Sequence, residues 1–269
     1  MDETYRSYFG FEKEPFAQDL DLDQILKTDE LLDVKHRFDY TLRIGGIGLI
    51  TGEIGSGKST ALRFAAGQLH PSEYHSFYVT ASTGSILELY RQIAAQMGID
   101  KSSNSKALMT RMIRKEIIEL CENKKLKVAL IIDEASLLRL EVFVELHTIC
   151  QFEKDSKPYL PVILAGQSSL VDKLMYRTSA PLASRIVARA HMEGLNRAGM
   201  QHYLLHHLQL VGTNKNLFED AAITAIHQGA GGLLRKANHL ARGALMAAAD
   251  EKSMTVTAEH VRLAATEIF

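Results

Sequence analysis

The chain has 269 residues, 46% of them hydrophobic, and a formal net charge of −1, which allows a large core and excludes a disordered protein. Its two cysteines, Cys121 and Cys150, lie far apart without metal-ligand spacing, which favours reduced core thiols over a disulfide or a metal site. No early apolar run approaches the roughly 20 residues that span a bilayer, and the acidic N-terminus does not resemble a signal sequence, so we expect a cytoplasmic protein without membrane insertion.

The most specific motif follows an apolar, strand-like run at residues 47–51. The next eight residues, Gly52-Glu-Ile-Gly-Ser-Gly-Lys58-Ser59, fill the phosphate-loop pattern G-x-x-x-x-G-K-[ST]. The glycines permit positive φ and close approach of backbone amides to a polyphosphate, and a helix predicted up to Leu69 aims its positive end at it. We therefore predict a nucleoside-triphosphate site formed by Gly52, Glu53, Ile54, Gly55, Ser56, Gly57, Lys58, Ser59 and Thr60.

The next stretch combines a strand at residues 76–80 with helices at residues 85–97 and 105–122. The polar turn before the second helix offers Ser105 as a helix N-cap. Residues 101–127 hold eight basic residues against three acidic ones, so this segment can face nucleic acid. A solvated amphipathic helix explains the same charges, and charge alone leaves both interpretations open.

A second motif supplies carboxylates. The apolar run from Lys127 ends in Asp133 and Glu134, which suits a central parallel strand that delivers both acids at its carboxyl end. Lys58 can reach the β- and γ-phosphates, whereas Ser59 and Asp133 are the predicted ligands of Mg²⁺. Glu134 can polarise the water that attacks the γ-phosphate. The alternative is a strand end followed by a solvated turn, and the matched phosphate loop makes this alternative less favoured. A helix is predicted next, at residues 140–151.

Two later strands carry further candidates. The strand at residues 162–166 ends before Gln167, which can orient the attacking water or sense the γ-phosphate; a surface glutamine is the alternative. Arg185 stands at the entry to the strand at residues 186–192, with Arg177 and Arg189 nearby, and it is the favoured candidate of the three. An arginine there cannot easily reach its own γ-phosphate, but it can reach that of a neighbouring subunit in a ring or filament. The alternative for Arg185 is a surface salt bridge.

Beyond residue 194 the sequence predicts only helices, at residues 197–210, 218–228, 233–249 and 258–268. Arg235 begins the third of these after a glycine turn, and it can reach back to the γ-phosphate and report the nucleotide state. His202 and His206 have the spacing of zinc ligands on a helix. Because no nearby acid or cysteine completes such a site, an ordinary lid helix is the favoured interpretation.

Together these elements predict an α/β fold: a five-stranded parallel P-loop sheet flanked by helices and followed by a small all-helical lid domain. The predicted divisions are an N-terminal segment at residues 1–45, a nucleotide-binding α/β domain at residues 46–194 and the lid at residues 195–269.

In this order, the motifs resemble those of the AAA+ ATPases. The opening Tyr8-Phe-Gly-Phe-Glu-Lys-Glu-Pro15-Phe16 narrows the similarity to the ExeA-like (general secretion pathway protein A) family, which shares F-G-x-x-x-x-P-F, T-G-E-x-G-x-G-K-[ST] and G-G-x-x-R-x-x-N elements. The resemblance covers essentially the whole chain and implies an ATPase that uses ATP and Mg²⁺. It also implies that Pro15 and Phe16 pack near the adenine, with a hydrophobic anchor for the N-terminus as the alternative.

This family has two functional classes. Its secretion members continue into a membrane span and a peptidoglycan-binding domain, whereas here Phe269 follows the lid directly. We therefore expect a stand-alone ATPase similar to the MuB and TnsC type of transposition regulator, which would assemble as a ring or filament on double-stranded DNA and direct a transposase. An ATPase that energises secretion without binding DNA is the alternative.

A DNA-binding assembly of this kind would grip the phosphate backbone through basic and hydroxyl side chains, without sequence preference and with strong salt dependence. The loop after the second strand and the basic segment supply the candidates, which are Thr83, Lys101, Lys106, Arg111 and Arg114.

Overall fold

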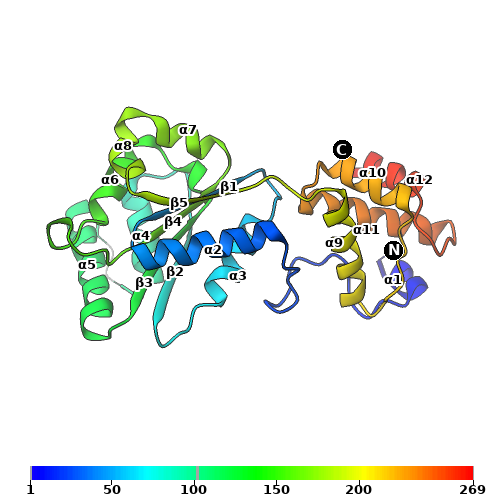
Figure 1. The fold of residues 1–269 in the computed structure, drawn as a ribbon, viewed down its shortest axis with the longest axis horizontal. Coiled ribbons are helices and arrows are strands. Elements are labelled where there is room, and N and C mark those ends of the chain that lie inside the picture. The colour runs from blue at the N-terminus through cyan, green and yellow to red at the C-terminus, as the bar shows by residue number, and fades with distance from the viewer. Residues whose placement is uncertain (1, 101–102, 269) are drawn as a thin grey trace. The chain divides into compact units, whose positions relative to one another are not determined.

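A five-stranded parallel sheet organises the computed structural model, which describes residues 2–100 and 103–268 (Figure 1). The strands lie in the order β2-β3-β4-β1-β5, and every neighbouring pair is parallel. This arrangement confirms the predicted α/β fold. The bounds of the strands are β1 (Ile47–Gly52), β2 (Tyr74–Thr80), β3 (Lys127–Asp133), β4 (Val162–Gly166) and β5 (Ile186–Met192).

The middle strands are buried on both faces. Every residue of β1 and β4 is buried, as is every residue of β3 after Lys127. A strand covered by helices on both faces has no polar side, which is why these segments read as continuous apolar runs in the sequence. The edge strand β5 instead alternates buried and exposed residues from Val187 to Met192.

The helices around the sheet differ in part from the predicted ones. The helix expected at residues 105–122 is an α-helix to Ile118 and a π-helical turn over Glu119–Asn123, and Ser105 caps it by accepting a hydrogen bond from the Leu108 N–H at 3.3 Å. The helices α2, α7 and α8 have no counterpart among the predicted elements. The bounds are α2 (Asp29–Ile44), α3 (Lys58–Gly67), α4 (Ile86–Gln96), α5 (Lys106–Ile118), α6 (Leu140–Ile149), α7 (Ser169–Met175) and α8 (Ala180–Ala183).

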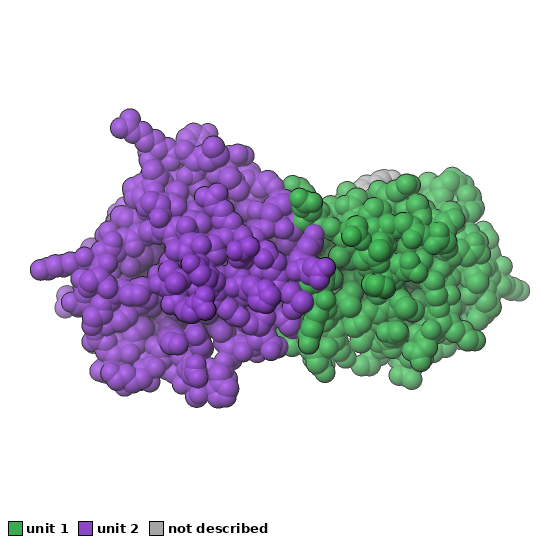
Figure 2. All heavy atoms as spheres, in the orientation of Figure 1, with its two compact units in different colours: residues 1–28, 53–57, 193–269 green, residues 29–52, 58–192 purple. Residues whose placement is uncertain are grey.

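The chain forms two compact units, which Figure 2 colours separately. We call residues 29–52 and 58–192 the sheet unit, and residues 1–28, 53–57 and 193–269 the lid unit. The lid unit contains the helices α1 (Asp2–Phe9), α9 (Arg197–Leu210), α10 (Asp220–Ala230), α11 (Leu234–Asp250) and α12 (Ala258–Ile268). Over the part of the chain that the structure describes, we find no helix whose length and apolar character would let it cross a membrane.

The N-terminal segment packs into the core of the lid unit. Phe16 is only 1% exposed; its ring stacks on His207 with centroids 5.1 Å apart and meets Phe218 edge-on at 6.1 Å. Pro15 beside it is buried as well. A ring enclosed in this way has no open face for a base, so these contacts favour the hydrophobic anchor over contact of Pro15 and Phe16 with adenine.

His207 is a buried neutral histidine. It is 2% exposed and lies between Phe16 and Tyr203, whose ring centroid is 4.5 Å from its own. Burial, with a smaller contribution from neighbouring His206, lowers the pKa of His207 to about 3. The ring of His206 contacts the carbonyl oxygen of Gln24 at 2.6 Å. The two histidines are therefore part of the packing between the N-terminal segment and α9.

We expect this burial to make the stability of the lid unit depend on pH. The pKa of His207 is 6.5 in the unfolded chain and about 3 in the folded one. Below pH 6.5 the unfolded chain therefore binds a proton that the folded chain does not, and the free energy of unfolding decreases as the pH is lowered. From pH 7 to pH 5 the free energy of unfolding of the wild type should decrease by about 2 kcal/mol more than that of His207→Phe. Urea denaturation of both proteins at pH 7, 6 and 5 measures it. The exposed His202→Phe is the matched control; a pH-independent difference between wild type and His207→Phe would contradict the prediction.

Candidate nucleotide site

The phosphate loop joins β1 to α3. Gly55 and Gly57 adopt φ angles of +85° and +102°, a region that favours glycine. Lys58 begins α3 and is 6% exposed, and its Nζ donates to the carbonyl oxygen of Gly52 at 2.9 Å. This bond runs from the last part of the loop to its first residue and keeps the ammonium at the loop. Ser59 is exposed, at the first turn of the helix.

The tip of the loop, Glu53–Gly57, belongs to the lid unit. The backbone N–H of Arg235, in the first turn of α11, donates to the carbonyl oxygen of Gly55 at 3.1 Å. A Cβ atom on Gly55 would lie 2.8 Å from the Cβ of Arg235, so a side chain at this position would force the two segments apart. The predicted lid arginine therefore adjoins the loop through its main chain, and its side chain is exposed.

Ser56 indicates that the loop suits a phosphate group. The residue is 1% exposed, and its Oγ has no hydrogen-bond partner among the described residues. Because buried hydroxyls are normally hydrogen-bonded, an unsatisfied one inside a phosphate-loop motif fits a site that ligand oxygens complete. Ser59 and Asp133 offer a hydroxyl and a carboxylate, oxygen ligands that Mg²⁺ takes, so the residues present fit a magnesium nucleotide.

The carboxylates end β3 in a defined geometry. Asp133 is 4% exposed and accepts two hydrogen bonds, from the Glu134 N–H to Oδ1 at 2.8 Å and from the Tyr78 hydroxyl to Oδ2 at 2.6 Å. Glu134 has a left-handed backbone conformation, with φ 53° and ψ 31°. Such a conformation costs a residue with a side chain about 1–3 kcal/mol and is enriched at active sites. Six other described non-glycine residues also have positive φ, so it is the position at the carboxyl end of β3 that distinguishes Glu134. The half-buried Glu134 side chain is thus a candidate for catalysis.

Tyr78 is a residue that sequence reasoning missed. It lies on β2, where Thr80 pairs with Asp133 and Tyr78 pairs with Ile131. The Ser59 hydroxyl is near enough to the phenol to lower its pKa in the manner of a hydrogen-bond donor. Burial, followed by the bond to Asp133, raises the pKa of Tyr78, so the hydroxyl stays protonated at neutral pH and can donate. A tyrosine near the end of a strand was the available signal, but its value depends on which strand is the neighbour.

Gln167 follows the strand between the loop and the carboxylates. In β4, Gly166 pairs with Thr51 of β1, and Leu164 pairs with Ile132 of β3. Gln167 therefore lies at the carboxyl edge of the sheet, where β1 and β3 also end, and it is half-buried. The structure brings together, at this edge of the sheet unit, the predicted residues Lys58, Ser59, Asp133, Glu134 and Gln167.

Arg185 lies at the amino-terminal ends of the strands, opposite the carboxyl ends where the predicted site residues lie. It precedes β5, whose first residue pairs with Ile47 at the start of β1, and its carbonyl oxygen accepts a hydrogen bond from the Ile47 N–H at 2.9 Å. The six residues of β1 separate this edge from the phosphate loop, a length of about 20 Å. The guanidinium is ion-paired with Asp155. Arg185 is therefore remote from Lys58 and Asp133 of its own sheet unit.

Two of the candidate DNA contacts adjoin α6. The carbonyl oxygen of Thr83 accepts a hydrogen bond from Arg139 Nε at 2.9 Å, and Lys106 Nζ lies 2.5 Å from Glu145 Oε1. Lys101 lies outside the described residues.

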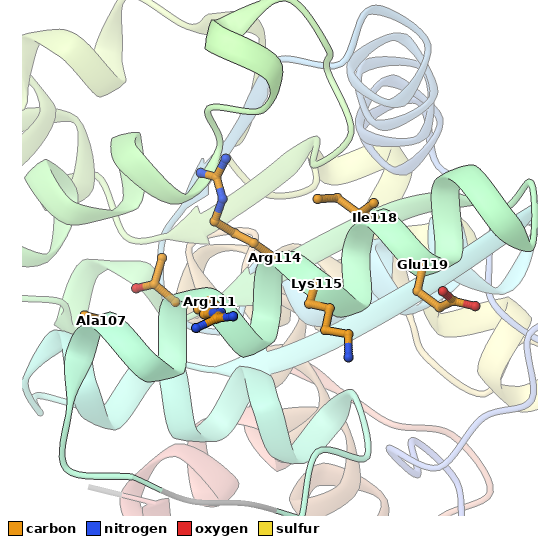
Figure 3. Close-up of a pocket in the computed structure, with 7 residues that line it drawn as sticks. Ala107, Arg111, Arg114, Lys115, Ile118 and Glu119 are labelled. Carbon is orange, nitrogen blue, oxygen red and sulfur yellow. The ribbon is translucent and has the colours of Figure 1, made fainter.

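The other two, Arg111 and Arg114, line an open groove of about 590 Å³ on α5 (Figure 3). The Arg114 guanidinium lies 4.5 Å from the ring centroid of Phe152 and donates to the carbonyl oxygen of Thr148 at 3.3 Å, and it points away from Lys115 in Figure 3. Arg111 and Lys115 are exposed. The groove therefore presents the charges of Arg111 and Lys115 to solvent, while Arg114 is held against neighbouring side chains.

Comparisons with known proteins agree with this geometry. Residues 43–174 match a family described as an AAA domain. Over 267 residues, 98% of its length, the chain is 30% identical to General secretion pathway protein A of Aeromonas hydrophila. The chain spans about half of that relative, 48% of its length.

Several solved structures share the fold. Cdc6p from Pyrobaculum aerophilum matches with a TM-score of 0.68 and 16% identity, over 98% of this chain and 71% of that one. The Aeropyrum pernix ORC1 protein in complex with DNA matches with a TM-score of 0.68 and 16% identity, over 94% of this chain and 68% of that one. The Thermotoga maritima RuvB Holliday junction branch migration motor matches with a TM-score of 0.57 and 16% identity, over 97% of this chain and 73% of that one. At these identities the similarity shows the fold.

Proposed function

We propose that ATP controls the assembly of this chain, an ATPase with an AAA domain at residues 43–174, on double-stranded DNA, where it regulates a transposase or its choice of target. The observation that carries the ATP-dependent part is the convergence of Lys58, Ser59, Asp133 and Glu134 at one edge of the sheet. We place this activity in the cytoplasm, where ATP and DNA are both available.

In this proposal each residue of the site has a separate part. The loop amides and Lys58 bind the phosphates, and Ser59 and Asp133 would hold Mg²⁺, which neutralises charge on the phosphates when bound. Glu134 accepts a proton from the attacking water, and Gln167 orients that water. Arg235 senses the γ-phosphate, since its main chain contacts Gly55 of the phosphate loop at 3.1 Å.

In an assembly, the neighbouring subunit would supply one further positive charge to the nucleotide site. Arg185 is about one strand length from Lys58 of its own sheet unit, so we propose that it serves the site of a neighbouring subunit in a ring or filament. To do so it must exchange its ion pair with Asp155 for the phosphates of that neighbour. Hydrolysis would then depend on subunit contact, and ATP would be consumed mainly in the assembled state.

DNA is the proposed polymer because several observations agree. The exposed Lys106, Arg111 and Lys115 lie along α5, and proteins bind the DNA backbone through such charges. Among proteins of this fold, the ORC1 structure is a complex with DNA and the Drosophila ORC structure is bound to DNA. The transposase is the partner implied by the resemblance to transposition regulators of the MuB and TnsC type.

We expect the double variant Lys106→Ala/Arg111→Ala to weaken DNA binding and flatten its salt dependence. Each lost phosphate contact should reduce the slope of log K against log salt by about 1. Fluorescence anisotropy of a labelled duplex, with a non-hydrolysable ATP analogue and at several salt concentrations, measures both quantities.

The matched control is Arg37→Ala/Arg43→Ala, which removes two charges from α2, a helix that packs beside β5 at the other end of the sheet. It should retain wild-type binding. Equal affinity and slope in both double variants and wild type would remove α5 from the DNA interface.

A secretion-related role is the second candidate, favoured by the 30% identity to General secretion pathway protein A across 98% of this chain. In that role the ATPase would energise assembly in the cell envelope without binding DNA. A wild-type protein that hydrolyses ATP but ignores duplex DNA at low salt would favour this second candidate.

A further inference from the structure

Tyr78 connects the two side chains that would hold Mg²⁺. Its hydroxyl lies 2.6 Å from Asp133 Oδ2 and within hydrogen-bonding reach of the Ser59 hydroxyl, which lowers the pKa of the phenol as a donor would. Ser59 comes from the first turn of α3, Asp133 from the end of β3 and Tyr78 from β2, so three separate elements of the sheet unit meet at one phenol oxygen. No part of the phosphate-loop motif or the Asp-Glu motif includes this tyrosine.

The directions of these hydrogen bonds follow from the groups themselves. An ionised carboxylate only accepts, so the Tyr78 O–H must donate to Asp133. With its single proton used, the phenol oxygen can only accept from Ser59, whose own O–H must then donate. The order is Ser59 to Tyr78 to Asp133. This order leaves the lone pairs of the Ser59 oxygen available for a cation.

The same chain of bonds also fixes the carboxylate. Asp133 Oδ1 accepts from the Glu134 N–H at 2.8 Å while Oδ2 accepts from Tyr78. A donor on each oxygen restricts rotation of the carboxylate about its Cβ–Cγ bond. Hydrogen bonds in series polarise one another, so the negative charge of Asp133 also strengthens the Ser59 oxygen as a ligand.

We propose that Tyr78 is a positioning residue for the metal part of the nucleotide site, orienting the Ser59 hydroxyl and the Asp133 carboxylate toward a divalent cation. This inference rests on the proposed ATP-binding function. Residues that orient metal ligands in this way typically raise metal affinity about 10- to 100-fold.

The test is Tyr78→Phe, which removes the hydroxyl and keeps the ring. The divalent cation is probed with Mn²⁺, titrated against the full chain with bound ADP and followed by electron paramagnetic resonance. We expect the Mn²⁺ affinity to fall about tenfold or more. ADP affinity measured in EDTA, which needs no metal, should stay within about twofold of wild type, because phosphate binding by the loop is untouched.

Tyr74→Phe is the matched control, because it removes a hydroxyl from the other end of β2, where the phenol lies 3.5 Å from Lys127 Nζ. It should bind Mn²⁺ as wild type does. Ser59→Ala provides a second comparison: if Tyr78 acts through Ser59, adding Tyr78→Phe to Ser59→Ala should weaken Mn²⁺ binding less than Tyr78→Phe does alone.

The outcomes separate this inference from the function on which it rests. Unchanged Mn²⁺ affinity in Tyr78→Phe, even with a lowered thermal stability, would overturn the positioning role and leave the ATP site standing. A wild-type chain that binds neither ADP in EDTA nor Mn²⁺ with ADP would overturn both.

Discussion

Replacing Glu134 by glutamine is expected to abolish ATP turnover while leaving ATP binding intact. A general base contributes about 10²- to 10⁴-fold to a rate, so phosphate release should fall by at least about 100-fold. Glutamine has the same shape, but its amide cannot take the proton of the attacking water. The bond from the residue 134 N–H to Asp133 Oδ1, 2.8 Å long, uses the main chain and is therefore retained.

The measurements are steady-state phosphate release and a separate titration of ATP binding. Glu141→Gln is the control, because Glu141 is a nearby acid whose side chain is 67% exposed and which lies in the first turn of α6. It should leave turnover unchanged. Normal turnover in Glu134→Gln would show that another group is the base.

Replacing Lys58 by alanine is expected to weaken ATP binding itself. Lys58 is only 6% exposed, and its ammonium is held at the loop by its bond to the Gly52 carbonyl oxygen at 2.9 Å. A hydrogen bond to a charged group contributes about 1.5–3 kcal/mol, so the Kd for ATP should rise about tenfold to a hundredfold. Isothermal titration calorimetry with Mg²⁺ present gives the Kd.

The exposed Lys124→Ala is the control for loss of one positive charge from the same unit, and its Kd should match that of wild type. A Kd for ATP in Lys58→Ala within about twofold of the control would contradict the placement of the phosphates at this loop. Circular dichroism of the variant separates a lost contact from a lost fold.

The sheet was accessible to sequence reasoning because its middle strands are buried on both faces. The predicted strands at residues 127–133 and 162–166 coincide with the buried strands β3 and β4, and the one at residues 186–192 coincides with the alternating edge strand β5. The helix α2, which has no counterpart among the predicted elements, also carries a local pattern: Leu31, Val34 and Phe38 are buried at spacings of three and four, which is the period of a helix. Local patterns of this kind are sufficient to predict most of the helices and strands.

The site was only partly accessible, because some of its geometry depends on contacts between distant segments. Lys58, Ser59 and Asp133 sit in motifs, but the role of Tyr78 follows from the pairing of β2 with β3, which no local pattern states. The packing of Phe16 on His207 depends likewise on a contact across 191 positions of the chain. Sequence motifs therefore identify groups that bind a ligand better than groups that orient them.

Duplex binding by the wild-type chain in different nucleotide states shows whether ATP controls assembly on DNA. Anisotropy of a labelled duplex would be followed at low salt with a non-hydrolysable ATP analogue and, in parallel, with ADP. If nucleotide in the loop from Gly52 to Ser59 controls assembly on DNA, the chain should bind the duplex tightly with the analogue and weakly with ADP. Equal binding in the two states, or no binding in either, would contradict ATP-controlled assembly on DNA.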